Sequence, residues 1–342
     1  MEYESSQTIY YDFNKEAFLI ADKTKKVRDE KKINDTSVFR EFVSKFTANK
    51  GALIGFFAII LICIFALFAP FLTPYQYDQI QAANQNLSPR IPGVESLGIF
   101  NGKIMGISQY EKTNLKNTYY FFGTDTLGRD LFARTAMGTR ISLFVAAVAV
   151  MIDMFIGVTF GLVSGFFGGV MDLFMQRIIE ILSGIPSIVV VTLLMIVFKP
   201  GLVTIILALV FTNWIGMSKL VRALVLKQKE QEYILAAKTL GASDFSLIFK
   251  EILPNIFGSV IVMTMMSIPG AIFMESFLSF LGLGIPEPMA SLGTLVSTGY
   301  KKMMIYPYMI AIPVTVFVIL MLSFNLVADG LRDALDPKMK NV

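Results

Sequence analysis

The chain has 342 residues, of which 54% are apolar and only 16% are charged, and its mean hydropathy is +0.62. Soluble globular domains carry about 25% charged residues, so this composition excludes an ordinary soluble globule. The net charge of +4 is too small to indicate a nucleic-acid partner, and the absence of histidine excludes His-based acid–base catalysis, Ser-His-Asp triads and His-rich zinc sites.

Residues 1–50 form a polar leader that carries ten lysines and arginines. The apolar run that comes next is longer than the core of a signal peptide, so we expect it to remain as a membrane anchor. Residues 37–50 have the spacing of an amphipathic helix that lies on the inner membrane surface. Its apolar side would consist of Val38, Phe39, Phe42, Val43 and Phe46.

Six stretches are long and apolar enough to cross about 30 Å of hydrocarbon. The third and fourth are separated by a tight turn at Lys199-Pro200-Gly201, and the single cysteine, Cys63, lies in the first, where we expect it to pack. The sequence therefore predicts an all-α, polytopic integral membrane protein with six transmembrane helices. The apolar stretches are 51–77, with the first helix at 51–73, then 141–171, 181–198, 200–218, 252–274 and 303–328.

Lysines and arginines gather in the leader, between the fourth and fifth predicted helices and in the tail at 331–342. Six crossings place these three segments on one side, which the positive-inside rule identifies as the cytoplasm. Lys301 and Lys302 fall on the other side and count against this orientation.

The polar segment at 74–134 follows the first helix and would lie outside the cell. Phe100-Asn101-Gly102-Lys103, flanked by apolar residues, is typical of a type I′ hairpin. We expect a small folded extracellular cap here, and a disordered loop is the alternative.

In the inner segment at 222–255, a run of residues with high helix propensity extends to Gly241. A second helical run begins after Ser243 or Asp244, either of which can cap a helix. This pattern predicts a helix, a turn and a second helix that ends at Leu253-Pro254, just before the fifth transmembrane helix. Two short helices joined by a sharp bend would form a rigid knob that suits docking to a partner. An ordinary amphipathic connector is the alternative.

Several residues inside the apolar stretches are candidates for packing or transport. Gly157, Gly161 and Gly165 form a ladder against which another helix can pack closely, from this chain or from a partner membrane protein. A lipid-exposed carboxylate at the bilayer centre costs at least about 2.5 kcal/mol, so three acidic residues should face a water-filled translocation path or a polar partner. These are Asp153, Glu180 and Glu275.

The residues Ala236-Ala237-x-x-x-Gly241, followed by Leu253-Pro254, resemble the signature of permeases of binding-protein-dependent ABC importers. Leu235 stands where that signature has glutamate, which leaves Glu232, one turn earlier, as the acidic residue of this helix. Three more stretches resemble the OppC/DppC branch, which serves oligopeptides and dipeptides. They are 123–142, 275–284 and 325–337, and the likeness covers nearly all of the chain after about Ser37.

The resemblance implies a type I ABC importer permease fold, with a core domain at 135–330, in the bacterial cell membrane with both termini in the cytoplasm. It implies no enzyme activity and no cofactor or metal on this chain, with ATP and Mg bound by two cytoplasmic ATPases of the OppD/OppF type. The other partners would be a sister permease of the OppB type and an extracellular peptide-binding protein of the OppA type, in a membrane of lipid. The ATPase-coupling residues would be Glu232, Leu235, Ala236, Ala237, Leu240, Gly241, Ala242, Ser243, Leu253 and Pro254.

The sequence leaves other functions open. Within the family the substrate could be a dipeptide, a nickel chelate or glutathione. An ion-coupled secondary transporter is suggested by Asp153 and the helix-breaking Pro186 and Pro269, but the two halves show no repeat. The Gly123-x-x-x-x-Gly128 spacing lacks the Lys-Ser/Thr of a phosphate-binding loop, so we expect no ATP hydrolysis by the chain alone.

Overall fold

The computed structural model describes residues 38–104, 107–112, 115 and 118–335. The chain divides into two units at Lys45–Phe46, and the second unit, residues 46–342, holds all of the long apolar helices. The leader before Val38, including Ser37, and the tail after Leu335 lie outside the described residues. The helix expected at 37–50 is present as α2 (Val38–Ala48), and α3 begins two residues later.

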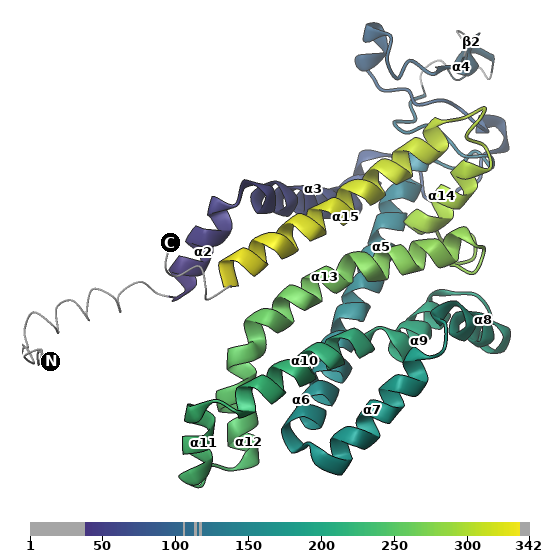
Figure 1. The fold of residues 1–342 in the computed structure, drawn as a ribbon. Coiled ribbons are helices and arrows are strands. Elements are labelled where there is room, and N and C mark those ends of the chain that lie inside the picture. The colour runs from purple at the N-terminus through teal and green to yellow at the C-terminus, as the bar shows by residue number, and fades with distance from the viewer. Residues whose placement is uncertain (1–37, 105–106, 113–114, 116–117, 336–342) are drawn as a thin grey trace, which may run out of the picture. The chain divides into compact units, whose positions relative to one another are not determined.

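In the described residues, five helical stretches are long and apolar enough to cross a membrane, and a sixth is possible where two helices meet at a bend of 78°. These helices, shown in Figure 1, make an all-α bundle. The five stretches are α3 (Lys50–Leu72); α5 (Leu131–Ile152) with the π-helical turn η4 (Asp153–Gly157) and α6 (Val158–Phe167); α9 (Leu202–Thr212) with α10 (Trp214–Lys229); α12 (Asp244–Ser246) with the π-helical η5 (Leu247–Ile252) and α13 (Leu253–Phe280); and α15 (Tyr308–Leu335).

The bent pair corrects the prediction of one straight helix at 181–198. The structure has two helices here, α7 (Gly169–Ser183) and α8 (Ser187–Phe198), separated by Gly184-Ile185-Pro186. Proline has no N–H for the helix ladder and forces the residue before it out of the helical region. The count of six crossings therefore holds when α7 and α8 together form one broken span.

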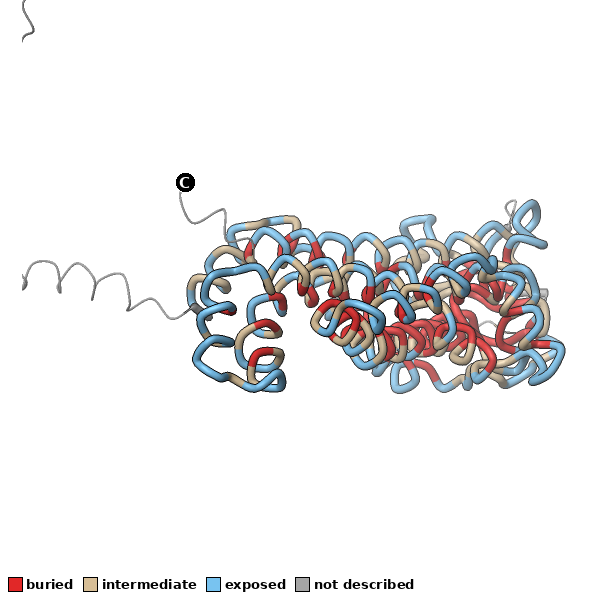
Figure 2. Tube along the Cα trace, turned by 60° about the horizontal axis from the view of Figure 1, so that its bottom comes forward, coloured by how far each residue is buried: buried red, intermediate tan, exposed pale blue. Residues whose placement is uncertain are grey.

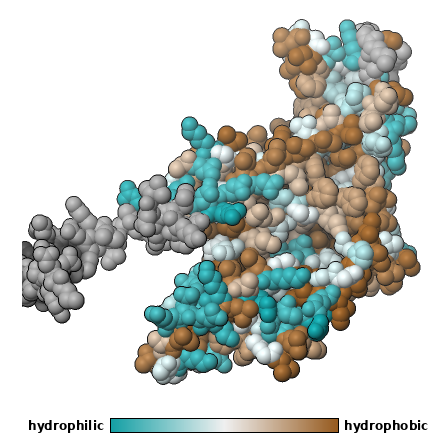
Figure 3. Space-filling view, viewed as in Figure 1, coloured by the Kyte–Doolittle hydropathy of each residue, from teal (hydrophilic) through white to brown (hydrophobic). Residues whose placement is uncertain are grey.

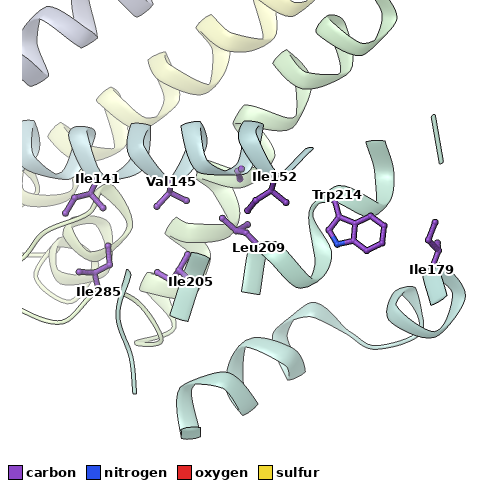
Figure 4. Packing of buried hydrophobic residues seen from close by; sticks show 10 residues of the cluster. Ile141, Val145, Ile152, Ile179, Ile205, Leu209, Trp214 and Ile285 are labelled. Atoms are coloured by element: carbon purple, nitrogen blue, oxygen red, sulfur yellow. The ribbon is translucent and has the colours of Figure 1, made fainter. Parts of the chain in front are cut away.

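The core lies where α5, α9 and α10 meet. In Figure 4, Ile141, Val145 and Ile152 project from α5 toward Ile205 and Leu209 of α9. Figure 2 shows the buried positions running through the interior of the bundle and the exposed positions around it. Burial of these side chains supplies the packing that holds the two spans together.

The glycine ladder packs inside this chain, against α10. A Cβ atom placed on any of its three glycines would come within 3 Å of α10 atoms, so only glycine permits this approach of α6 and α10. Of the two partners considered for the ladder, the structure shows a helix of this same chain. The contacts are Gly157 with Met217, Gly161 with Ser218 and Val221, and Gly165 with Val225.

Between α3 and α5 the chain folds into a small cap of short elements. Tyr75 stacks on Tyr120 with ring centroids 4.4 Å apart, and the buried Tyr110 hydroxyl donates to the Ser88 carbonyl at 2.8 Å. The cap lies at one end of the bundle, and α11 and α12 lie at the other (Figure 1). Its elements are the short 3-10 helices η2 (Ala82–Asn84) and η3 (Val94–Leu97), strands β1 (Lys103–Ile104) and β2 (Ile107–Ser108), and α4 (Gln109–Lys112).

The hairpin prediction at Asn101-Gly102 is wrong. The paired strands are β1 and β2, two residues further along, with Lys103 opposite Ser108. The Asn101 side chain instead donates to the Gly98 carbonyl and accepts from the Lys103 N–H, forming a local turn of its own.

Helix α5 begins at the foot of the cap. The Asp130 carboxylate caps it by accepting from the N–H groups of Phe132 and Ala133, and it accepts from the Thr73 hydroxyl at 3.1 Å. Burial raises the pKa of Asp130 to about 6. A short helix, α14 (Leu292–Tyr300), follows α13 at the same end and starts with a capping box at Ser291.

The first span is tied to the core at its proline. Pro70 lies inside α3 and cannot donate to the carbonyl of Ala66, four residues earlier. Arg140 of α5 supplies the missing donor, with Nε 2.5 Å from the Ala66 oxygen and a second N–H donated to the Leu67 oxygen at 2.9 Å. A charged donor thus satisfies the carbonyl that the proline leaves free.

We expect Arg140→Met to lower the stability of the purified protein by about 1.5–3 kcal/mol, the usual value of a hydrogen bond to a charged group. In a Pro70→Ala background the loss should be smaller by about 1 kcal/mol, because alanine restores the N–H to the Ala66 carbonyl. Thermal denaturation in detergent measures both effects.

The matched control is Arg177→Met, which removes an exposed ion pair with Glu180 and should change stability by less than about 0.5 kcal/mol. Strict additivity of the Arg140 and Pro70 changes would contradict this account of the contact.

Candidate coupling surface and buried polar sites

The predicted helix and turn at the inner segment are present. Helix α11 (Glu232–Thr239) ends at Leu240, and Gly241 follows with φ +85°. Ser243 caps the next helix, its hydroxyl accepting from the Ser246 N–H at 3.3 Å. A Cβ at Gly241 would meet no atom within 4 Å, so the turn requires glycine for its backbone conformation and not for lack of space.

Helix α11 is anchored to the bundle through one side chain and exposes most of the others. Ile234 is 3% exposed and packs in one cluster with Val225 of α10 and Ile256 of α13. By contrast Leu240 is 88% exposed, and Phe245 of α12 is 71% exposed. The knob therefore exposes some large apolar side chains among polar ones and is fixed to the two long helices on its inner side.

The other candidate coupling residues lie around this surface. Glu232, Leu235, Ala236 and Ser243 are exposed, while Ala237 and Ala242 are half-buried. Tyr233 is exposed as well; partial desolvation raises the pKa of its hydroxyl, which accepts a hydrogen bond from Asn255.

The predicted helix end at Leu253-Pro254 is wrong. The helix that starts at Asp244 continues without a break to Phe280, and Pro254 lies in the first turn of α13. The preceding turn, η5, is π-helical, which shifts the hydrogen-bond ladder by one residue just before the proline. The second helix of the knob, α12, and the fifth span are consequently one continuous helix.

Asp153 is buried with a partner from another span. Its side chain is 1% exposed and accepts a hydrogen bond from Asn213 Nδ2 at 2.9 Å, at the junction of α9 and α10. It stands in η4, where the widened helical turn departs from the regular ladder. Asp153 was expected to face either a water-filled path or a polar partner, and within this chain it faces a polar partner.

Glu275 is enclosed by hydroxyl groups. It is fully buried, and the hydroxyls of Ser142, Ser276 and Ser279 donate to it at 3.1, 3.3 and 2.8 Å. Ser142 belongs to α5, so the carboxylate joins two spans.

Glu180 is the one member of the three predicted path candidates that reaches the surface of this chain. Its side chain is 59% exposed and pairs with Arg177 one turn earlier, at 2.5 Å. Asp172, also on α7, instead joins two helices, since Arg222 of α10 donates to both its oxygens at 2.6 Å.

A charged network at the cap end of α5 and α13 had no predicted role. Arg129 donates to Asp125 at 2.7 Å and to both oxygens of Glu287 at 3.1 and 2.9 Å. These hydrogen bonds hold the pKa of the Glu287 carboxyl below its usual range. Arg134 completes the network, with Nε 3.4 Å from Asp125. The sequence signal was the Gly123–Asp130 motif, which gives no hint of Glu287, 158 positions after Arg129.

The hydropathy of the surface divides along the bundle. Figure 3 shows hydrophilic residues gathered over the end that carries α10, α11 and α12, and hydrophobic residues along the flank of α15. Among the described residues, no group of three or more Cys, Asp or Glu side chains is arranged to hold a metal ion.

Comparison with known proteins agrees with this architecture. The sequence model of the family "Binding-protein-dependent transport system inner membrane component" matches residues 157–341, and that of the "N-terminal TM domain of oligopeptide transport permease C" matches residues 37–89. The chain is 42% identical to the oligopeptide transport system permease protein OppC of Bacillus subtilis, over 89% of this chain and 91% of that protein.

Two dipeptide permeases are nearly as similar. The dipeptide transport system permease protein DppC of Bacillus subtilis is 40% identical, over 95% of this chain and 93% of that protein. DppC of Lactococcus lactis subsp. cremoris is 39% identical, over 88% of this chain and 91% of that protein. The chain therefore belongs to the family of inner-membrane components of binding-protein-dependent transport systems.

Membership makes the chain an integral inner-membrane subunit of an ABC transporter and not an enzyme, as the resemblance implied. A permease of this family works with a partner permease, ATPase subunits and a substrate-binding protein. ATP hydrolysis accordingly takes place in subunits separate from this chain.

The stability and the substrate uptake of variants distinguish a structural role of the buried Asp153 from a role in the translocation path. Asn213→Leu should destabilise the protein by about 1.5–3 kcal/mol because it removes the amide donor of a buried carboxylate, and Asp153→Leu in the same chain should recover part of that loss. Thermal denaturation in detergent measures this. Asp153→Asn should keep substrate uptake near the wild-type rate.

Thr212→Val serves as the neighbouring control, since Thr212 donates only to the Ala208 carbonyl one turn earlier. Unchanged stability in Asn213→Leu, together with lost uptake in Asp153→Asn, would assign Asp153 to the path instead.

Proposed function

We propose that this chain is the OppC-type permease of an ATP-driven oligopeptide importer and forms half of the translocation path. The observation that carries the proposal is the similarity to OppC over nine-tenths of both chains, combined with an exposed knob built on Gly241. An OppB-type permease would supply the other half of the path, and an OppA-type binding protein would deliver the peptide.

The knob would dock on the ATPases. Two OppD/OppF-type subunits would bind ATP and Mg and contact the exposed face around Leu235 and Leu240, on the cytoplasmic side with both termini. The cap would then face outward. Since Ile234 packs against both α10 and α13, and α12 continues into α13, a displacement of the knob would move both spans as one rigid body.

In this mechanism most of the remaining candidate residues would hold helices together. Asp153 and Glu275 would hold neighbouring spans together with hydrogen bonds, and Glu180, with its exposed side chain, is the path candidate that a second permease could contact. The glycine ladder would keep α6 and α10 together when α11 is pushed.

A dipeptide substrate is the second candidate, because the DppC relatives are 40% and 39% identical. Competition for uptake between a labelled tetrapeptide and unlabelled dipeptides separates the two. Preference for the tetrapeptide supports the OppC assignment, and preference for dipeptides supports the other.

The coupling role is tested at the turn. Gly241→Val should strain the backbone by about 1–2 kcal/mol, since a β-branched residue adopts positive φ poorly. Co-purification of the ATPases and peptide-stimulated ATP hydrolysis should fall about tenfold, while insertion and pairing with the sister permease persist. Ala237→Asp, which adds charge at the same surface, should have the same effect.

Gly93→Val is the matched control. Gly93 lies in the cap with φ +80° and also has no atom within 4 Å of a built Cβ, so valine is likewise strained by its positive φ there, at the opposite end. Equal ATPase attachment in wild type and Gly241→Val would assign coupling to another part of the chain.

A further inference from the structure

A hollow opens at the outer end of α13, next to the charged network. It has a volume of about 350 Å³, within the range of ligand pockets, and lies between the first turn of α5, the end of α13 and α14. We call it the outer hollow. The polar residues that line it are Arg134, Ser279, Glu287, Thr294, Ser297 and Thr298.

Arg134 is a buried cation that lines this hollow, and its Nε donor is unused. Its side chain is 2% exposed. One N–H group donates to the Tyr77 carbonyl at 3.3 Å, while Nε has no hydrogen-bond acceptor among the described residues. A guanidinium has five N–H donors, so a buried arginine with one hydrogen bond has strong capacity to bind an acceptor.

The nearby carboxylates are committed to the other arginine. Arg129 donates to both oxygens of Glu287 and to one oxygen of Asp125 at 2.7–3.1 Å. Arg134 Nε lies 3.4 Å from Asp125, and Arg134 Nη2 lies 3.9 Å from Glu287. Both contacts are ion pairs that are too long or too poorly aligned to be hydrogen bonds. The positive charge of Arg134 is therefore the less well satisfied of the two.

The hydroxyl groups on the wall offer the complementary chemistry. Ser297 donates its proton to the Phe280 carbonyl at 3.1 Å, and Thr298 donates to the Thr294 carbonyl at 2.7 Å. With their protons engaged, both oxygens can accept a hydrogen bond from a ligand. A site with a cation at its base and acceptors on its wall suits a carboxylate that is joined to an N–H group.

We propose that the outer hollow binds a carboxylate of the transported peptide on Arg134, while the adjoining peptide N–H donates to the hydroxyl oxygens of Ser297 and Thr298. This inference rests on the proposed function. The carboxylate could be the C-terminus or an acidic side chain. The hollow would hold one end of the peptide at the outer end of the bundle, away from the knob.

The first experiment measures uptake by the full transporter, with its sister permease, ATPases and binding protein, in proteoliposomes. The substrates are trialanine, trialanine amide and Ala-Ala-Asp amide. The ratio of trialanine uptake to trialanine amide uptake should fall at least tenfold in Arg134→Gln and partly recover in Arg134→Lys. Lys301→Gln removes an exposed positive charge at the same end and should leave the ratio unchanged.

Each outcome has a defined meaning. An unchanged ratio in Arg134→Gln overturns the carboxylate site. Uptake of Ala-Ala-Asp amide at the rate of trialanine shows that a side-chain carboxylate also fits, and uptake at the rate of trialanine amide shows that the site takes the C-terminus. If the wild-type complex takes up none of the peptides, the proposed function fails before the site is tested.

A second measurement keeps Arg134 intact, in case its variants do not fold. In a Cys63→Ala background, Ser297→Cys in the assembled transporter is labelled from outside with an impermeant thiol reagent. With the binding protein saturated by either peptide, trialanine should slow labelling at least threefold and trialanine amide should not. Equal labelling rates with the two peptides would overturn the proposal.

Discussion

The structure depends on one constraint, which is that a polar group inside hydrocarbon must find its partner within the protein. Arg140 supplies the hydrogen bond that Pro70 denies to the Ala66 carbonyl. Asp153 receives the amide of Asn213, and Glu275 receives serine hydroxyls from two spans. Each of these contacts joins helices that are distant in sequence, so the same hydrogen bonds that satisfy buried groups also set which spans are neighbours.

Close packing completes what the polar contacts begin. The glycine ladder brings α6 against α10, and Ile234 ties the knob to α10 and α13. The continuous helix from Asp244 to Phe280 links the knob to the opposite end of the bundle, where the outer hollow lies. A force on the knob can therefore reach the outer end without passing through a flexible connection. This continuity is the physical basis of the coupling that we propose.

Sequence patterns predicted those features that depend on local chemistry. Apolar length gave the spans, and the turn at Gly241 follows from the need for positive φ at the end of α11. Features that depend on distant partners were missed: Glu287 meets Arg129 across 158 positions. The two errors at prolines were opposite: a helix break was missed at Pro186, and a helix end was wrongly predicted at Pro254. Pro186 breaks a run that hydropathy alone reads as one helix, whereas Pro254 lies inside a continuous helix, just after the π-helical turn η5 has shifted the hydrogen-bond ladder.

The central claim is that the knob end faces the cytoplasm and the cap faces outward, which is required if ATPases act on one and a binding protein on the other. The direct test uses single cysteines in a Cys63→Ala background, treated with an impermeant thiol reagent on intact cells. Leu97→Cys, at a cap position that is 75% exposed, should be labelled. Lys227→Cys, in the exposed last turn of α10, should be labelled only after the membrane is permeabilised. Labelling of Lys227→Cys in intact cells with protection of Leu97→Cys would contradict the orientation and the coupling account with it.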